Sequence, residues 1–213
     1  MNLFEFDENE KLINKVDFVI GTDEAGRGPA AGGVWAAACA MRKNCNVSLF
    51  SKLNDSKKLT SKIRDDLYEL VKENFYYSIK ISDVAQIEKM NILNASLYAM
   101  KQAVEDVINQ LKTQNIITIV DGNKLIKNFN YSQKYIIKGD SKSAVIAASS
   151  ILAKVSRDRF MDEIDKKYPN YDWKNNKGYL TSKHLEAIDK YGLTKYHRPS
   201  FLKKHFNVQQ KLF

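Results

Sequence analysis

Apolar residues along the chain follow two patterns, and each pattern predicts one type of secondary structure. Short apolar runs bounded by Gly, Asn or Asp predict strands, whereas apolar residues three or four positions apart predict amphipathic helices. The predicted strands are 16–24, 33–41, 75–83, 115–123 and 133–140. The predicted helices are 61–74, 91–113, 141–168 and 181–192, with Pro169 stopping the third and Gly192 the fourth.

The order of these elements predicts an α/β fold. Two strands precede the first helix, and the later strands follow helices, as crossover connections require. We therefore expect a mixed sheet flanked by helices, with antiparallel strands first and crossover-linked strands later. Pro, Asn and Lys cluster between residues 168 and 177, which predicts a main domain, 1–168, and a basic helical extension, 169–213.

Charge is distributed unevenly along the chain. Lys and Arg number 34 against 25 Asp and Glu, a net charge of +9, and residues 174–213 contain nine basic residues but only two acidic ones. Such an asymmetry is typical of a segment that contacts a polyanion. A solvated, lysine-rich surface would give the same counts, so charge alone leaves both alternatives open.

Composition also bears on the cellular compartment. No apolar run approaches the roughly 18 residues that span a bilayer, and the first residues lack the pattern of a signal peptide. Two cysteines, Cys39 and Cys45, do not make a disulfide framework. We expect a cytoplasmic monomer that does not contact membranes.

Acidic residues follow three of the predicted strands. Asp23 and Glu24 end the first strand, Asp121 follows the run IITIV, and Asp140 follows YIIKG. Ligand sites form where strand ends meet at one edge of an α/β sheet. Because side chains alternate along a strand, Asp23 and Glu24 converge only if the strand ends there, as the following glycines and proline suggest.

Each acidic residue also has a simpler interpretation. Asp140 could be a helix N-cap, Asp121 could serve the Asp-Gly turn, and Glu24 could lie on the surface. Taken together these simpler interpretations are disfavoured, because residues that only form turns rarely all follow buried strands of one sheet. Two like charges 4 Å apart repel by about 4 kcal/mol at an effective dielectric constant of 20, so four gathered carboxylates require cations.

The nature of the cation follows from the oxygen ligands. Carboxylates suit Mg²⁺ or Mn²⁺, and we expect one or two such ions. Zinc is disfavoured, because the three histidines and two cysteines show no zinc-ligand spacing. Bound cations would also explain why a glycine-rich loop, GRGPAA, directly follows two carboxylates, since metal ions can mediate between phosphate and acid.

Two other phosphate-loop motifs are weak or absent. Gly26, Gly28 and Ala31 satisfy the dinucleotide-binding spacing G-x-G-x-x-A, but Pro29 and the later glycines disfavour the helix that this motif needs. The P-loop motif G-x-x-x-x-G-K-[ST] does not occur. A nucleotide-cofactor enzyme is therefore a minor alternative.

Six motifs occur in the order and spacing of a known family. The chain carries DEAGRGP, DSKKL, VDGN, KGDSKSAVIAASSILAKVSRDR, KGYLTSKH and HRPSF, spread over roughly residues 17–205. This combination resembles the type 2 ribonuclease H family (ribonuclease HII). The resemblance implies a ribonuclease H-like fold with a C-terminal helical extension. It also implies endonucleolytic cleavage of the RNA strand of RNA–DNA hybrids, and of duplex DNA at single embedded ribonucleotides.

The resemblance also implies roles for individual residues. It assigns catalysis and metal binding to Asp23, Glu24, Asp121 and Asp140, with Mn²⁺ or Mg²⁺ activating a water that leaves 5′-phosphate and 3′-hydroxyl ends. It makes Gly26, Arg27 and Gly28 the loop that reads the ribose 2′-OH, and Tyr179 the side chain that stacks on the sugar. A non-catalytic nucleic-acid-binding module of the same fold is the alternative, which the four acidic residues disfavour.

Three further features remain open from the sequence alone. Lys57 and Lys58 in DSKKL could bind phosphate or be solvated, and Tyr179 could be a packing residue. The final five residues, Gln209–Phe213, have the form Gln-x-x-Leu-Phe, similar to peptides that bind the bacterial sliding clamp. The stronger alternative is a helix end whose Leu212 and Phe213 fold back onto the domain.

Overall fold

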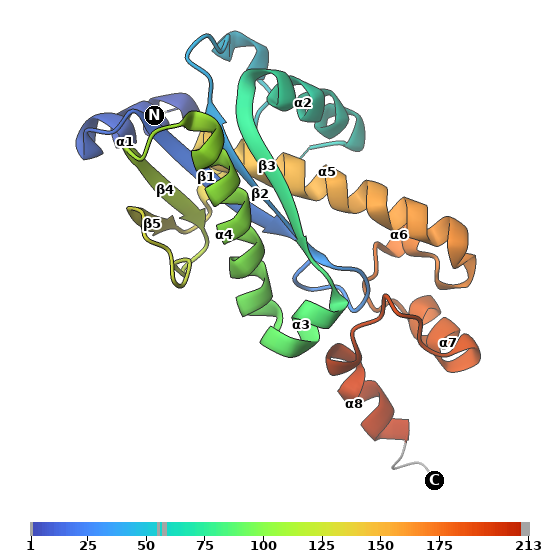
Figure 1. Ribbon diagram of the computed structural model, residues 1–213. Helices are drawn as coiled ribbons and strands as arrows, with labels where there is room; N and C mark the ends of the chain where they lie inside the picture. Colours follow the sequence, from blue (N-terminus) through green and yellow to red (C-terminus); the bar gives the residue numbers. More distant parts are fainter. Residues whose placement is uncertain (1, 55, 57–58, 210–213) are drawn as a thin grey trace.

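The computed structural model describes residues 2–54, 56 and 59–209. Its main feature is a five-stranded sheet in the order β3-β2-β1-β4-β5 (Figure 1). The strands are β1 (Phe18–Ala25), β2 (Val34–Met41), β3 (Phe75–Ser82), β4 (Ile116–Asp121) and β5 (Gln133–Ile136). β2 is antiparallel to β1 and β3, whereas β1, β4 and β5 are parallel, which confirms the predicted mixed sheet.

Helices cover both faces of the sheet. The longer helices are α1 (Leu3–Asn14), α2 (Ser61–Asn74), α4 (Ile92–Leu111), α5 (Ala144–Lys167), α7 (Ser182–Tyr191) and α8 (Pro199–Gln209). The shorter ones are α3 (Val84–Met90), α6 (Trp173–Asn176) and the 3₁₀ turns η1 (Val47–Phe50), η3 (Gly139–Ser141) and η4 (Pro169–Tyr171). α4 lies on one face, and α5 lies on the other with α1 and α2 (Figure 1).

The apolar alternation of β1 explains this layering. Val19 belongs to the core on the α5 face and Ile20 to the core on the α4 face. Gly21 lets α5 approach β1 closely, because a Cβ at this position would lie 2.5 Å from the backbone nitrogen of Ile146. The close approach matters for function, since it brings the first turns of α5 to the strand that carries Asp23 and Glu24.

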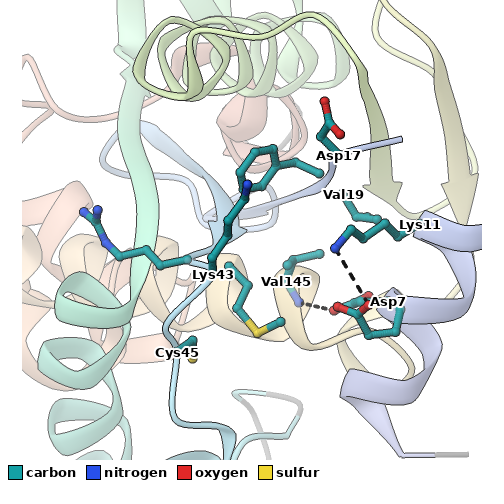
Figure 2. A pocket seen from close by; sticks show the side chains of 11 residues that line it. Asp7, Lys11, Asp17, Val19, Lys43, Cys45 and Val145 are labelled. Carbon is teal, nitrogen blue, oxygen red and sulfur yellow. Dashed lines mark hydrogen bonds and ion pairs between the residues drawn. The ribbon is translucent and has the colours of Figure 1, made fainter. Parts of the chain in front are cut away.

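The sequence did not predict α1, which is fixed to the first turn of α5. Asp7 is 5% exposed, and its Oδ2 accepts a hydrogen bond from the backbone nitrogen of Val145 at 2.9 Å (Figure 2). Glu10, also buried, forms an ion pair with Lys134 of β5. Asp7 lines a cavity of about 210 Å³ at the start of β1, the end opposite Asp23.

The C-terminal helices pack onto the far end of α5. Trp173 is fully buried and forms one core cluster with Met161 and Ile164 of α5 and with Ala30 and Ala31 of the loop after β1. The division of the chain at residue 168 stays a prediction. No helix in the described part of the chain is long and apolar enough to cross a membrane.

Candidate active site

Asp23 and Glu24 lie among the last residues of β1, which ends at Ala25, one residue after the predicted end. β1 continues to Ala25, and Asp23 and Glu24 pair in register with Ala37 and Ala36 of β2. Both side chains nevertheless line one cavity beside the glycine-rich loop. Asp23 is 6% exposed, and its Oδ1 accepts a hydrogen bond from the backbone nitrogen of Glu24 at 2.7 Å.

Asp121 and Asp140 lie at the ends of neighbouring segments, as predicted. Asp121 is the last residue of β4, and its Oδ1 accepts a hydrogen bond from the backbone nitrogen of Gly139 at 2.6 Å. Asp140 is buried in η3, directly before α5. Ser143, not Asp140, caps α5, because its hydroxyl accepts from the backbone nitrogen of Ile146. The interpretation of Asp140 as only the N-cap of this helix is therefore wrong.

The charges of the other three carboxylates act on Asp23. Burial raises the pKa of Asp23 well above its usual value, and the negative charges of Glu24, Asp121 and Asp140 raise it further. Such an accumulation of negative charge around a buried carboxyl group fits a divalent cation, for which carboxylate oxygens are the preferred ligands.

The side chains of the four acidic residues do not form a coordination shell in this arrangement. Within the described ranges, no group of three or more His, Cys, Asp or Glu side chains could hold a metal ion as it stands. Glu24 instead forms an ion pair with Arg27, with 3.2 Å between Oε1 and Nη1, and Asp121 accepts from Gly139. The assignment of the four carboxylates as metal ligands remains a proposal that rests on their shared electrostatics and donor chemistry.

A cavity of about 280 Å³ joins the acidic residues to the glycine-rich loop. It is lined by Asp23, Glu24, Ala25, Gly26, Arg27, Gly28, Ser56, Ser150, Lys154, Arg157 and Tyr179. Asp121 and Asp140 do not line it. The cavity thus brings the first acidic pair together with the loop and with the tyrosine of the C-terminal extension.

Tyr179 lies directly over the glycine loop. Tyr179 is exposed, with a relative accessibility of 53%, which favours a binding role over a packing role. A Cβ at Gly28 would lie 3.3 Å from Tyr179 Cε1. Gly26 has φ +99°, and a Cβ there would lie 2.2 Å from Arg157 Nε, so no side chain fits without rearrangement.

Two buried arginines, which the sequence reasoning did not single out, hold this loop. Arg198 is fully buried and donates to the carbonyl oxygens of Gly26 at 2.8 Å, Arg27 at 3.3 Å and Gly32 at 2.8 Å. Arg157 donates to the carbonyl oxygens of Ala31 and Lys177. Burial lowers the pKa of Arg198 to about 9, and the charge of Arg157 adds to this effect.

Both arginines could have been predicted as site residues from their position inside family motifs. Arg157 lies in VSRDR and Arg198 in HRPSF. Among the predicted site residues, Lys57 and Lys58 lie outside the described residues, as do positions 210–213 of the C-terminal peptide.

Solved structures of the same fold are ribonucleases. Ribonuclease HII of Archaeoglobus fulgidus, in a structure of a PCNA:RNase HII complex, matches with a TM-score of 0.68 and 22% identity, covering 85% of this chain and 93% of that one. Bst-RNase HIII in complex with Mn²⁺ matches with a TM-score of 0.72 and 15% identity, covering 91% and 70%. The chain therefore has the fold of these ribonucleases H.

Sequence comparison gives the family. The model of the family described as ribonuclease HII matches residues 20–209. A ribonuclease HII of Caldicellulosiruptor bescii is 48% identical over 200 residues, covering 93% of both chains, and one of Clostridioides difficile is 46% identical over 204 residues, covering 95% of this chain and 76% of its own. The chain belongs to the ribonuclease HII family and is a metal-dependent endoribonuclease that acts on RNA–DNA hybrids.

Proposed function

We propose that this endoribonuclease also cuts duplex DNA at single embedded ribonucleotides, with Asp23, Glu24, Asp121 and Asp140 as its metal ligands. The observation that carries the proposal is that one cavity contains Asp23, Glu24, the Gly26–Gly28 loop and Tyr179. A substrate phosphate placed near the acidic pair would have its sugar next to the loop and the tyrosine.

In this proposal the acidic residues bind the metal ions, and the glycine loop recognises the ribose. When bound, one or two Mn²⁺ or Mg²⁺ ions would activate water and stabilise the leaving oxygen, which gives 5′-phosphate and 3′-hydroxyl ends. Gly26 and Gly28 present backbone groups to the ribose 2′-OH, because no side chain stands between. Arg27 lines the cavity with a half-exposed side chain, and Lys57 and Lys58 are proposed to bind flanking phosphates.

Replacing Asp121 with Asn tests the acidic site. We expect Asp121→Asn to abolish cleavage of a duplex with one ribonucleotide while leaving duplex binding largely intact, because losing a negative charge does not weaken attraction to phosphate. Cleavage with Mn²⁺ or Mg²⁺, and binding by fluorescence anisotropy in EDTA, are the two measurements. Near-normal turnover of the variant would exclude the metal-ligand assignment.

A sliding clamp is the proposed protein partner. The support is the Gln-x-x-Leu-Phe form of Gln209–Phe213, together with the PCNA-bound structure of the Archaeoglobus fulgidus relative. In this proposal Leu212 and Phe213 fill an apolar pocket of the clamp and Gln209 hydrogen-bonds at its edge.

A further inference from the structure

Two fully buried histidines lie beneath Tyr179. His184 of α7 is 0% exposed, and His197, in the segment before α8, is 1% exposed. Their ring centroids are 5.3 Å apart, and the rings of Tyr171 and Trp173 surround them. Because neutral polar rings are costly to bury without partners, each ring nitrogen requires a specific hydrogen bond.

The hydrogen bonds fix the tautomer of His184. The carbonyl oxygen of Tyr179 lies 2.9 Å from His184 Nδ1, and a carbonyl oxygen can only accept, so Nδ1 carries the proton. His184 Nε2 is then an acceptor, which agrees with the Nε1–H of Trp173 donating to it at 3.0 Å. Because Nε2 accepts and Nδ1 donates, the ring is neutral, and burial, which lowers the pKa of His184, favours this form.

The tautomer of His197 follows from the same network. The backbone nitrogen of Thr194 donates to His197 Nδ1 at 2.9 Å, so the proton of His197 is on Nε2. That Nε2–H lies 3.2 Å from His184 Nε2, whose single lone pair it shares with the Nε1–H of Trp173. Burial lowers the pKa of His197 to about 4, with a smaller effect of His184, so both rings stay neutral.

The histidine pair links the glycine loop to the segment that carries Tyr179. His197 forms a β-bridge with Ala31, and the backbone nitrogen of Arg198 donates to the carbonyl oxygen of Ala30, so this segment is fixed to the glycine loop. His184 holds the carbonyl oxygen of Tyr179 on the other side. Within the described residues, the ring of Tyr179 meets the loop at Gly28.

We propose that His184 is a positioning residue for Tyr179. Trp173 and His197 fix the tautomer of His184, and His184 in turn holds Tyr179 in place over the Gly26–Gly28 loop. The position of Tyr179 then determines the enzyme's preference for a single ribonucleotide. The inference rests on the proposed function, because it requires that Tyr179 contacts the sugar at the cut site. His184 and His197 do not touch substrate, since both are buried inside the C-terminal helical extension.

The hydrogen-bond network can be tested without any activity. The chain has three histidines, so two-dimensional ¹H–¹⁵N spectra of the ¹⁵N-labelled protein resolve each ring, and His205 serves as a reference. We expect His184 in the Nδ1–H form and His197 in the Nε2–H form, both neutral at pH 6. An Nε2–H tautomer at His184 would remove its bond to Tyr179 and overturn the proposal.

Two matched substitutions separate positioning from stability. His184→Gln places an amide near the Nε2 position, which keeps partners for Trp173 and His197 but frees the Tyr179 carbonyl. His184→Asn places its amide near Nδ1, which keeps the Tyr179 bond but leaves Trp173 and His197 without their acceptor. The selectivity ratio is kcat/KM on a single ribonucleotide divided by kcat/KM on an RNA tract. For His184→Gln this ratio should fall about fivefold, which corresponds to the free energy of one hydrogen bond. For His184→Asn it should stay near the wild-type value.

The melting temperatures should rank in the opposite order, with His184→Asn lower than His184→Gln, because Asn leaves two buried donors unpaired. A selectivity ratio that follows melting temperature would show that His184 is only a core residue, and the proposal would fail. Tyr179→Ala is measured alongside. Equal losses on both substrates in that variant, with the histidine tautomers unchanged, would reject the role of Tyr179 itself and with it the role of His184.

Discussion

At the scale of single residues, the contact between Gly28 and Tyr179 can be tested with one added methyl group. A Cβ at Gly28 would lie 3.3 Å from Tyr179 Cε1, so Gly28→Ala forces the tyrosine to shift by a few tenths of an ångström. We expect kcat/KM on a single ribonucleotide to fall on the order of fivefold, because small displacements of positioning groups are costly. The loss of kcat/KM on an RNA tract should be smaller, since the tract can shift along the site and present a neighbouring 2′-OH group to the loop.

Gly192→Ala is the matched control. Gly192 has φ +78° and no neighbour within 4 Å of a Cβ, so this variant should lose stability through backbone strain without changing selectivity. Gly28→Ala should keep its melting temperature. If both variants changed selectivity alike, the contact between Gly28 and Tyr179 would not be the cause.

The sequence predicted the four carboxylates but not the arginines, for a physical reason. Asp23, Asp121 and Asp140 follow apolar runs, and such runs show in the sequence where strands end. Arg198 donates hydrogen bonds to backbone carbonyl oxygens about 170 positions earlier in the chain. Every residue has such an oxygen, so the sequence does not indicate which of them accepts. The predicted end of β1, Glu24, lies one residue before the observed end at Ala25, where pairing with β2 stops before the glycine.

At the scale of elements, α1 shows why a pattern of apolar residues can miss a helix. Its fully buried residues are acidic, Asp7 and Glu10, so its buried side carries the wrong polarity for an amphipathic pattern. Capping by Asn2 and Glu5 starts the helix, and Asp7 then fixes it to α5. In contrast, α2 and α5 have apolar buried faces and caps at Thr60 and Ser143, and both were predicted closely.

Asp7 predicts a pH dependence of stability. Burial raises the pKa of Asp7 to about 7 from 3.8, so the folded state binds more protons between these values and stability falls as pH rises from about 4 to about 7. Asp7→Asn keeps an oxygen acceptor for Val145 and cannot ionise. We expect it to raise the free energy of unfolding at pH 8 by up to about 4 kcal/mol, with the difference vanishing near pH 4.

Urea unfolding at several pH values measures this effect. Asp17→Asn removes the same charge from an exposed carboxylate near the same cavity and serves as the control. A wild-type stability that does not fall between pH 4 and pH 7 relative to Asp7→Asn would show that Asp7 is ionised at little cost.

At the scale of the whole molecule, the basic extension should govern the salt dependence of duplex binding. A truncation after Trp173 is a poor test, because the extension shares a core with α5. Replacing the exposed residues Lys174, Lys183 and Lys195 with Gln preserves that core. Each lost phosphate contact should reduce the slope of log K against log salt by about 0.9.

The control places the same charge loss at the opposite end of the sheet. Lys15, Lys43 and Lys112 are exposed near the start of β1, the end of β2 and the start of β4, away from Asp23. Replacing these three with Gln should leave the slope nearly unchanged. Equal changes in both triple variants would mean that net charge, and not the extension, determines binding.

The proposed clamp contact makes the last prediction at this scale. Leu202, fully buried, anchors α8 near its start, so the last five residues lie beyond that anchor. Deleting residues 209–213 should leave the melting temperature and the cleavage of a short duplex unchanged while abolishing co-elution with a bacterial sliding clamp. Leu212→Ala with Phe213→Ala should reproduce the loss, and Lys211→Gln should not, because the pocket takes apolar side chains. A fall of several degrees in melting temperature on deletion would instead make Leu212 and Phe213 part of the core, and the clamp proposal would be wrong.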